Sequence, residues 1–384
     1  MKTNFPIEKF KPLATPFYYY DVELLKKTAE ALKSEADKYG YVVHYALKAN
    51  PNHKILKVLK EYGFGADCVS GNEVQRAIEC GFTPDHIAFA GVGKTDEEIE
   101  IGLKHKIFTF NCESIPEIEN TNELAKKSNT VAAIAIRINP NVDAHTHHYI
   151  TTGLEENKFG ISEWQFEEVL GLLKTLHNVR LISLHFHVGS QITDLSVFEK
   201  LCLRVNEIQG WFKNHGLKFE HINLGGGLGI DYADPAEHAI ADFTNYFAIV
   251  SKNLNVEKGQ KVHFEIGRAI VGQCGSLIAK VLYVKHGQKK SFAIVDAGMT
   301  DLIRPALYQA FHKIENITST GIEKVYDVVG PICESSDCFA QGISLTEVTR
   351  GDLLAMLSAG AYGEVMASQY NLRKLPGHYY SDEL

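Results

Sequence analysis

The chain of 384 residues is long enough for two domains, or for one large domain with an appendage. Its hydrophobic content of 45% and charged content of 22% are ordinary for a globular protein, and its net charge of −8 argues against a general nucleic-acid binder, because no basic excess neutralises phosphates. Seven scattered cysteines form no disulfide framework, and residues 1–11 lack an apolar signal-peptide core. We therefore expect a soluble cytoplasmic protein with neither a membrane nor a nucleic-acid partner.

Strand-like and helix-like segments alternate from residue 15 to residue 265. The strands are short runs of β-branched and aromatic residues, and one helix opens with the capping-box pattern Thr95–Glu98. Eight strand–helix units across roughly 230 residues match the size of a closed (β/α)8 barrel of the TIM type. We predict barrel strands at residues 41–44, 65–70, 87–90, 108–110, 131–138, 181–187, 221–224 and 262–265. We predict helices at 23–38, 54–62 and 72–80, from 95 onward, between 110 and 131, at 164–176 and at 194–215.

The alternation ends after residue 265. Strand-like segments at 270–284, 291–296, 323–329 and 352–356 follow one another without long helices between them. They predict a second, mostly antiparallel β-domain, which an N-terminal strand at 15–20 could join. The expected fold is therefore α/β, with a barrel at 22–269 and a β-domain formed by 1–21 and 270–384.

Chemically reactive residues cluster at one predicted rim of the barrel. Barrel active sites lie at the carboxyl ends of the strands. At or just after these ends the sequence places Lys48, Asp67, Arg137, His187, Gly225–Gly227 and Glu265.

Lys48 follows a buried strand and precedes the turn signal Asn50-Pro51. Burial disfavours an ammonium ion and lowers a lysine pKa, which makes the amine available as a nucleophile toward carbonyls. A lysine that simply extends its amine to solvent from the strand end is the alternative.

A glycine run, Gly225–Gly229, follows the seventh predicted strand. Glycines let backbone N–H groups approach a phosphate closely. Ile230 stands where the dinucleotide-binding fingerprint requires a glycine, so that fingerprint is absent. A phosphate site and a tight strand-to-loop turn both remain open.

Histidines could serve a metal or a planar ligand. His185 and His187 stand two residues apart and are expected on one strand face; a metal site would need a third ligand. Alternatively, His187 stacks on a planar ligand while Ser190 reaches a phosphate. A loop with three further histidines is expected to be solvated, with a metal cluster as the alternative (His145, His147 and His148).

A buried carboxylate at Glu265 needs a partner, either a protonated heteroaromatic nitrogen or an arginine such as Arg268.

In the second domain, Cys333 lies in a loop after Gly330-Pro331. Its C-x4-C spacing to Cys338 has no second pair, so zinc is not expected. Cys333 is either a reactive acid or an inert buried thiol.

Together these segments resemble the fold type III pyridoxal-phosphate decarboxylases, and most closely the diaminopimelate decarboxylases. Glu265-Ile266-Gly267-Arg268 replaces the usual Glu-Pro-Gly-Arg and retains both charged residues. The matching segments span nearly the whole chain in the family's order: Tyr45–Asn50, Asn157–Ile161, His185–Ile192, Gly225–Gly229, Glu265–Arg268, Arg304–Tyr308, Gly330–Ser335 and Ala359–Tyr362.

The resemblance implies an alanine racemase-like fold and a pyridoxal 5'-phosphate site. Lys48 would form the covalent imine link to the cofactor, and His187 would stack on its ring. Glu265 would pair with the ring nitrogen and keep it protonated, which favours decarboxylation; the similar alanine racemases have an arginine there. The remaining cofactor-binding residues would be Asp67, Arg137, Ser190, Gly226, Gly227, Gly267, Arg268 and Tyr362.

The resemblance also implies a homodimer with shared active sites, in which Cys333 and Glu334 enter the partner's site. Cys333 would return the proton after loss of CO2, and Glu334 would contact the distal ammonium of the substrate. The distal carboxylate would be bound by Arg268, Arg304 and Tyr308, and Tyr362 would contact both cofactor and substrate.

The expected reaction is decarboxylation of meso-2,6-diaminopimelate to L-lysine and CO2, the last step of lysine biosynthesis. Arginines suited to a second carboxylate favour this substrate over ornithine or arginine. A carboxynorspermidine decarboxylase is a further alternative. A non-catalytic binding homologue is disfavoured, because Lys48, Glu265 and Cys333 are all present.

Overall fold

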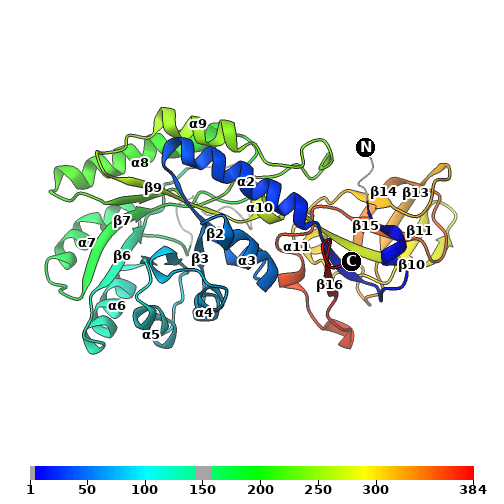
Figure 1. Ribbon diagram of the computed structural model, residues 1–384, viewed down its shortest axis with the longest axis horizontal. Helices are drawn as coiled ribbons and strands as arrows, with labels where there is room; N and C mark the ends of the chain where they lie inside the picture. Colours follow the sequence, from blue (N-terminus) through cyan, green and yellow to red (C-terminus); the bar gives the residue numbers. More distant parts are fainter. Residues whose placement is uncertain (1–4, 143–157) are drawn as a thin grey trace. The chain divides into compact units, whose positions relative to one another are not determined.

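Eight parallel strands close into a barrel in the computed structural model, which describes residues 5–142 and 158–384 (Figure 1). Strand β9 pairs with β2, with Glu265 opposite His44, and this pairing completes the ring. The strands are β2 (Val42–Ala46), β3 (Gly65–Cys68), β4 (Ile87–Phe89), β5 (Thr109–Cys112), β6 (Ala132–Arg137), β7 (Val179–His185), β8 (His221–Asn223) and β9 (Lys261–Ile266).

A helix follows each of the first seven barrel strands, and Figure 1 shows these helices around the outside of the ring. The predicted capping box is confirmed, because Thr95 accepts the Glu98 N–H and the Glu98 carboxylate accepts the Thr95 N–H. The helices are α3 (His53–Glu61), α4 (Gly71–Glu79), α5 (Asp96–His105), α6 (Ile115–Lys127), α7 (Phe166–Leu173), α8 (Ser196–Asn214) and α9 (Phe243–Asn253), and α2 (Val22–Tyr39) precedes β2.

The chain folds into two compact units. Among the described residues, the barrel unit consists of 29–142, 158–229 and 242–267. The β unit consists of 5–28, 230–241 and 268–384, so the short segment 230–241 after the glycine run belongs with the β-strands.

The β unit contains an eight-stranded sheet in which five strand pairings are antiparallel and two are parallel. The N-terminal strand joins it, as expected, between β10 and β16. Its strands are β1 (Phe17–Tyr20), β10 (Gly275–His286), β11 (Ser291–Val295), β12 (Ile314–Asn316), β13 (Glu323–Val329), β14 (Cys338–Thr346), β15 (Leu353–Met356) and β16 (Gly377–Tyr380), with short helices α1 (Ile7–Phe10), α10 (Arg268–Val271) and α11 (Arg304–Tyr308).

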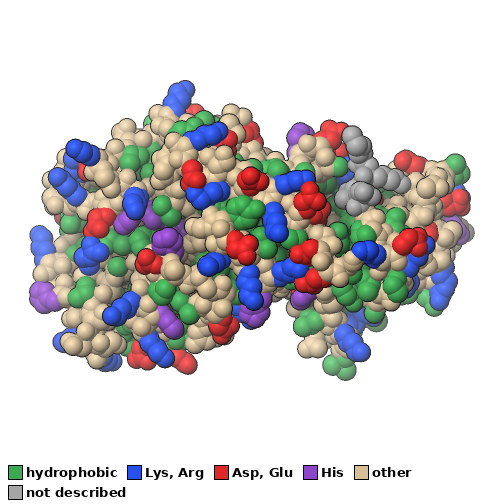
Figure 2. Space-filling view, viewed as in Figure 1, with side chains coloured by type: hydrophobic (Ala, Val, Ile, Leu, Met, Phe, Trp, Pro, Cys, Tyr) green, Lys and Arg blue, Asp and Glu red, His purple; other side chains and the backbone are tan. Residues whose placement is uncertain are grey.

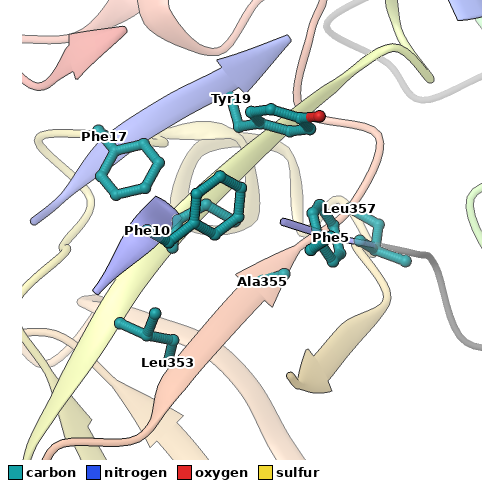
Figure 3. Close-up of a cluster of buried hydrophobic side chains, with 8 residues drawn as sticks. Phe5, Phe10, Phe17, Tyr19, Leu353, Ala355 and Leu357 are labelled. Atoms are coloured by element: carbon teal, nitrogen blue, oxygen red, sulfur yellow. The ribbon is translucent and has the colours of Figure 1, made fainter. Parts of the chain in front are cut away.

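Figure 3 shows an aromatic and aliphatic cluster that anchors the N-terminus on this sheet. Phe10 meets Phe17 and Tyr19 edge to face, with ring centroids 5.3 and 5.0 Å apart. The cluster thus joins chain segments more than 300 residues apart, and its members are Phe5, Phe10, Phe17, Tyr19, Ile278, Leu353, Ala355 and Leu357.

Most predicted strand boundaries differ from the observed ones by one or two residues, and two of the errors change the local structure. The segment from Ile270 to Cys274 is not strand, because the Gly272 N–H bonds to the Arg268 carbonyl and closes a helical turn before β10 begins. Strand β7 ends at His185, so His187 lies in the loop beyond it rather than on the same strand face.

Three histidines form a hydrogen-bonded chain inside the barrel. His44 Nδ1 lies 3.1 Å from the His86 carbonyl, which can only accept, so Nδ1 carries the hydrogen. His44 Nε2 then accepts from His263 Nδ1 at 2.9 Å, and His263 Nε2 accepts from His221 Nδ1 at 2.9 Å. Burial lowers the pKa of all three rings, which agrees with neutral histidines in this ordered chain. Burial lowers the pKa of His44 to about 4, despite the opposing charge of Glu265.

This chain of histidines makes the stability of the barrel pH-dependent. Unfolded His44 takes up a proton below its ordinary pKa of about 6.5, whereas folded His44 stays neutral down to about 4. The unfolding free energy should therefore fall as pH drops through this window, by about 2 kcal/mol between about pH 7 and pH 5 from this residue alone. Urea unfolding of wild type and His44→Phe at both pH values measures this. The penalty of the substitution should shrink at the lower pH, and an equal penalty at both would contradict the assignment.

No helix in the described ranges is long and apolar enough to cross a bilayer. Figure 2 shows acidic and basic side chains interspersed over the visible face, without a region in which Lys and Arg gather alone. Charges of both signs spread in this way agree with the modest net charge of −8.

Candidate active site

Lys48 lies in a short 3-10 turn, Leu47–Ala49, directly after β2. Its side chain is 38% exposed, so it is not fully buried, and its Nζ lies 3.6 Å from Asp67 Oδ2 on the neighbouring strand. Asp67 is fully buried, and neither of its carboxylate oxygens has a hydrogen-bond partner among the described residues. Burial, helped by the charge of Glu265, raises the pKa of Asp67, while Lys48 opposes that shift.

Glu265 is held by side chains from three other strands. Its Oε1 accepts amide hydrogens from Asn111 at 3.0 Å and Asn223 at 2.7 Å, and its Oε2 lies 2.9 Å from His185 Nε2. Burial by itself raises the pKa of Glu265, but the interactions with His185 and Lys48 outweigh it and hold the pKa below its usual range. The carboxylate is therefore an anion inside the barrel.

The glycine run packs against backbone where no side chain would fit. A Cβ on Gly225 would lie 2.3 Å from the Phe186 carbonyl, and a Cβ on Gly226 would lie 2.1 Å from that of Glu265. Gly227 has φ +115° and faces the Gly189 carbonyl, 2.9 Å from an added Cβ. The loop is therefore restricted to glycine by close packing and by backbone conformation.

This loop meets the one after β7. The Gly226 N–H donates to His187 Nδ1 at 3.2 Å, so Nδ1 carries no hydrogen. Burial, followed by the charge of Arg137, lowers the pKa of His187, which agrees with a neutral ring. Ser190 lies in the same loop, which a bridge between Ile192 and Leu228 joins to the glycine run. The loop that carries His187 and Ser190 therefore lies against the glycine run.

Arg137 ends β6 and is buried. Its Nη1 donates to Glu113 Oε1 at 2.7 Å, and its guanidinium lies 4.7 Å from the Phe159 ring centroid. The matching segment that includes Phe159 begins at Asn157, which lies outside the described residues, as do the three histidines at 145, 147 and 148. The alternatives proposed for those histidines are therefore untested.

Gly267 allows the ends of the first and last barrel strands to approach. A Cβ there would lie 3.0 Å from the Ala49 Cβ and 3.1 Å from the Ala46 Cβ. The turn that carries Lys48 is thereby brought close to the end of the strand that carries Glu265.

These barrel residues fit pyridoxal 5'-phosphate. The buried Asp67 carboxylate, which has no hydrogen-bond donor in the described parts of the chain, lies beside the primary amine of Lys48. His187 offers a neutral flat face, and the loop that carries it lies against the glycine run. Glu265 supplies a fixed anion, which suits a protonated ring nitrogen.

A second cluster lies in the β unit. Both Arg268 and Arg304 are buried, and each donates an Nη1 hydrogen bond to the Tyr232 hydroxyl, at 2.6 and 2.7 Å. His312 accepts from Arg304 at 3.2 Å and donates from Nδ1 to the Leu357 carbonyl. The Tyr362 ring lies 4.9 Å from the Arg268 guanidinium. Tyr308 ends α11, four residues after Arg304.

The loop with Cys333 is ordered by a buried aspartate. Asp337 accepts backbone N–H groups from Met299 at 2.6 Å and Ile332 at 2.7 Å. Cys333 is exposed, contrary to the alternative of a buried inert thiol, and its N–H donates to Asn371. Glu334 is also exposed and accepts from the Tyr370 hydroxyl at 2.8 Å.

Sequence reasoning missed several residues that shape these clusters. Asn111, Glu113 and Asn223 stand near the ends of barrel strands, so inspection of every strand end for polar residues could have found them. Tyr232 and His312 do not stand at strand ends, so such an inspection would not have found them. Tyr232 contacts arginines 36 and 72 residues away along the chain, and His312 contacts Arg304 from an irregular segment.

Comparisons with known proteins agree with this chemistry. Residues 23–272 match the family model described as "Pyridoxal-dependent decarboxylase, pyridoxal binding domain". The chain is 58% identical to a diaminopimelate decarboxylase of Bacteroides thetaiotaomicron over the full length of both.

Two solved structures are also similar. The diaminopimelate decarboxylase of Helicobacter pylori, crystallised with L-lysine, is 41% identical with a TM-score of 0.91, covering 97% of this chain and 93% of that one. The corresponding enzyme of M. jannaschi is 34% identical, also with a TM-score of 0.91, covering 98% and 89%. The chain belongs to the diaminopimelate decarboxylases, a family of pyridoxal-dependent decarboxylases with a (β/α)8 barrel and a β-domain of the alanine racemase-like fold.

Proposed function

We propose that this chain decarboxylates meso-2,6-diaminopimelate to L-lysine and CO2 with pyridoxal 5'-phosphate bound in the barrel unit. The observation that carries the choice of substrate is the pair of buried arginines on the Tyr232 hydroxyl. Among the described residues, Arg304 has no carboxylate within ion-pair distance. A buried guanidinium without an anion suits a second carboxylate on the substrate.

The barrel residues would hold the cofactor. When bound, pyridoxal phosphate supplies an electron sink for the electron pair left behind as CO2 departs. Lys48 would link to it covalently, His187 would cover its ring, and Glu265 would bind its ring nitrogen. Its other contacts would come from Asp67, Arg137, Ser190, Gly226, Gly227, Gly267, Arg268 and Tyr362.

Asp67 and Lys48 would act together before substrate arrives. The Lys48 amine is a nucleophile only after it has lost its proton, so a nearby group must tolerate the loss of its positive charge. Asp67 lies 3.6 Å from this amine and has a raised pKa. Asp67 and Glu265 are themselves buried, so their carboxylates are shielded from water.

The arginine cluster would bind the distal carboxylate of the substrate through Arg268 and Arg304, with Tyr308 as a further hydrogen-bond donor. His312 restricts the Arg304 side chain, because it accepts one of its hydrogens and is itself tied to the Leu357 carbonyl. A guanidinium held in place loses less conformational freedom when a ligand binds. Tyr362 would contact both substrate and cofactor.

Replacing Arg304 with alanine should therefore raise KM for meso-diaminopimelate by about 10- to 100-fold, because a charge-assisted hydrogen bond to the distal carboxylate is lost. Steady-state kinetics with a circular dichroism check of folding would measure this. Arg350, an exposed arginine that also lies over a tyrosine ring, gives the matched control, and Arg350→Ala should leave KM unchanged. An unchanged KM in Arg304→Ala would contradict the role.

A homodimer with shared active sites is the second part of the proposal. Cys333 would return a proton to the α-carbon after CO2 leaves, and Glu334 would contact the distal ammonium. Both residues are exposed to solvent in a single chain. Return of a proton to the α-carbon requires a site from which water is excluded, so both residues need to be covered. The same unit exposes the apolar residues Val365, Tyr370, Leu372 and Leu375, with Leu372 97% exposed. Burial of such residues by a second copy would cover this loop.

Release of CO2 from meso-diaminopimelate, ornithine, arginine and carboxynorspermidine, compared side by side, tests the proposed substrate. Only the first combines two amino groups with two carboxylates in a straight chain. Preference for ornithine, arginine or carboxynorspermidine would overturn the assignment, and no release from any of them would favour a binding homologue.

We place the reaction in the cytoplasm. All seven cysteines are free thiols, and five of them are buried. Reduced cysteines are typical of that compartment.

A further inference from the structure

Glu265 has one acceptor position left for a ligand. A carboxylate oxygen can accept about two hydrogen bonds. Oε1 already accepts from Asn111 and Asn223, whereas Oε2 accepts only from His185, counting the described residues. A protonated nitrogen that binds Glu265 without displacing a neighbour must therefore donate to Oε2, beside His185.

The orientation of both amides is determined by their surroundings. Asn223 Oδ1 accepts the Gly225 N–H at 2.9 Å, which turns its NH2 group toward Glu265. A flipped Asn111 would set its amide oxygen against the carboxylate oxygen, an arrangement that repels. Oε1 is thus occupied by two neutral donors and cannot exchange them easily.

The position of the donated hydrogen on His185 follows from the contacts of its two nitrogens. Nδ1 is buried and has no hydrogen-bond partner within the described ranges. A ring with its only hydrogen on Nδ1 would leave that buried N–H unsatisfied, which costs about 1–3 kcal/mol, and would set a bare nitrogen against Oε2. The Glu265 oxygen can only accept, so His185 carries a hydrogen on Nε2 and donates it to Oε2.

We propose that His185 is a positioning residue that sets the protonation of the cofactor's ring nitrogen, by donating its Nε2 hydrogen to the same Glu265 oxygen that the ring nitrogen uses. This inference rests on the proposed role of Glu265. A second donor on Oε2 lowers the proton affinity of that oxygen. The proton between Oε2 and the ring therefore stays on the ring nitrogen. Without His185 it would move toward Glu265, and the ring would become a weaker electron acceptor.

The test uses holoenzyme loaded with pyridoxal phosphate labelled with 15N at the ring nitrogen. The nitrogen chemical shift distinguishes a protonated from a neutral ring. Wild type should show the protonated value, and His185→Phe, which removes the donor but keeps a flat ring, should shift toward the neutral value. His185→Gln retains an N–H donor and should restore the protonated value. The value of kcat in His185→Phe should fall by about 10- to 100-fold while KM changes little.

His221→Gln is the matched control, because His221 bonds to His263 in the same barrel and does not touch Glu265. It should keep the protonated shift; a neutral shift there would mean that any barrel histidine has this effect, which overturns the specific role of His185. A protonated ring in both wild type and His185→Phe also overturns the inference and leaves the role of Glu265 intact. A neutral ring in wild type overturns the role of Glu265 itself.

A second measurement needs no variant. Wild-type protein with 15N-labelled histidine, free of cofactor, should show a hydrogen on the Nε2 of His185. A ring whose only hydrogen is on Nδ1 would overturn the inference even if His185→Phe fails to fold.

Discussion

Lys48→Ala should lose decarboxylase activity by about 10³-fold or more, together with the visible absorbance of the bound cofactor. A lysine amine that forms the covalent link is chemically irreplaceable by a methyl group, and general acid–base and covalent groups each contribute two to four orders of magnitude. Absorbance spectra of the purified protein and CO2 release from meso-diaminopimelate measure the two effects independently.

Lys57→Ala provides the matched control, because Lys57 is an exposed lysine on α3, a few residues after the Lys48 turn. It should retain both the absorbance and the activity. A Lys48→Ala protein that keeps the visible band would refute the assignment of Lys48. Loss of the band in Lys57→Ala as well would indicate a folding effect.

Mixing Lys48→Ala with Cys333→Ala chains should restore about a quarter of wild-type activity. Each variant alone should be nearly inactive, because one lacks the covalent link and the other lacks the proton donor, a contribution of about 10²-fold or more. If each site takes Lys48 from one chain and Cys333 from the other, a mixed dimer has one intact site of two. Random exchange makes half of the dimers mixed, which gives the quarter.

The control mixes Lys48→Ala with His187→Ala, two substitutions in the barrel unit. Every site of a mixed dimer then carries one of the two defects, so no activity should return. No recovery in the Lys48→Ala and Cys333→Ala mixture, under conditions where exchange is verified by mass spectrometry, would mean that each site is complete within one chain.

Both predictions depend on residues that could be identified from the sequence. Lys48, Asp67, Arg137 and Glu265 could be placed at one rim because parallel barrel strands end at the same face, and short runs of β-branched and aromatic residues locate each strand. Segments without such a run were harder. The strand β14, Cys338–Thr346, was not predicted, because Gly342 with φ +62° and several exposed polar residues interrupt its pattern.

The contacts that tune these residues could not be read from the chain. Sequence left Glu265 with a choice between a ring nitrogen and an arginine, whereas the folded barrel surrounds it with Asn111, Asn223 and His185. Asn111 is 154 positions from Glu265 along the chain, and only the strand register brings the two side chains to the same height inside the barrel. The exposure of Cys333 was equally undecided, since burial of a loop depends on what packs over it.

The sequence by itself determined which chemical groups this protein possesses and which end of each barrel strand carries them, because strand period and strand direction are local properties. Only the tertiary structure decided how those groups are protonated and oriented. The tautomers of His185 and the His44 chain, and the sharing of Tyr232 by Arg268 and Arg304, depend on hydrogen-bond partners from distant segments. No local pattern encodes such partners, because barrel closure and strand register determine which side chains meet.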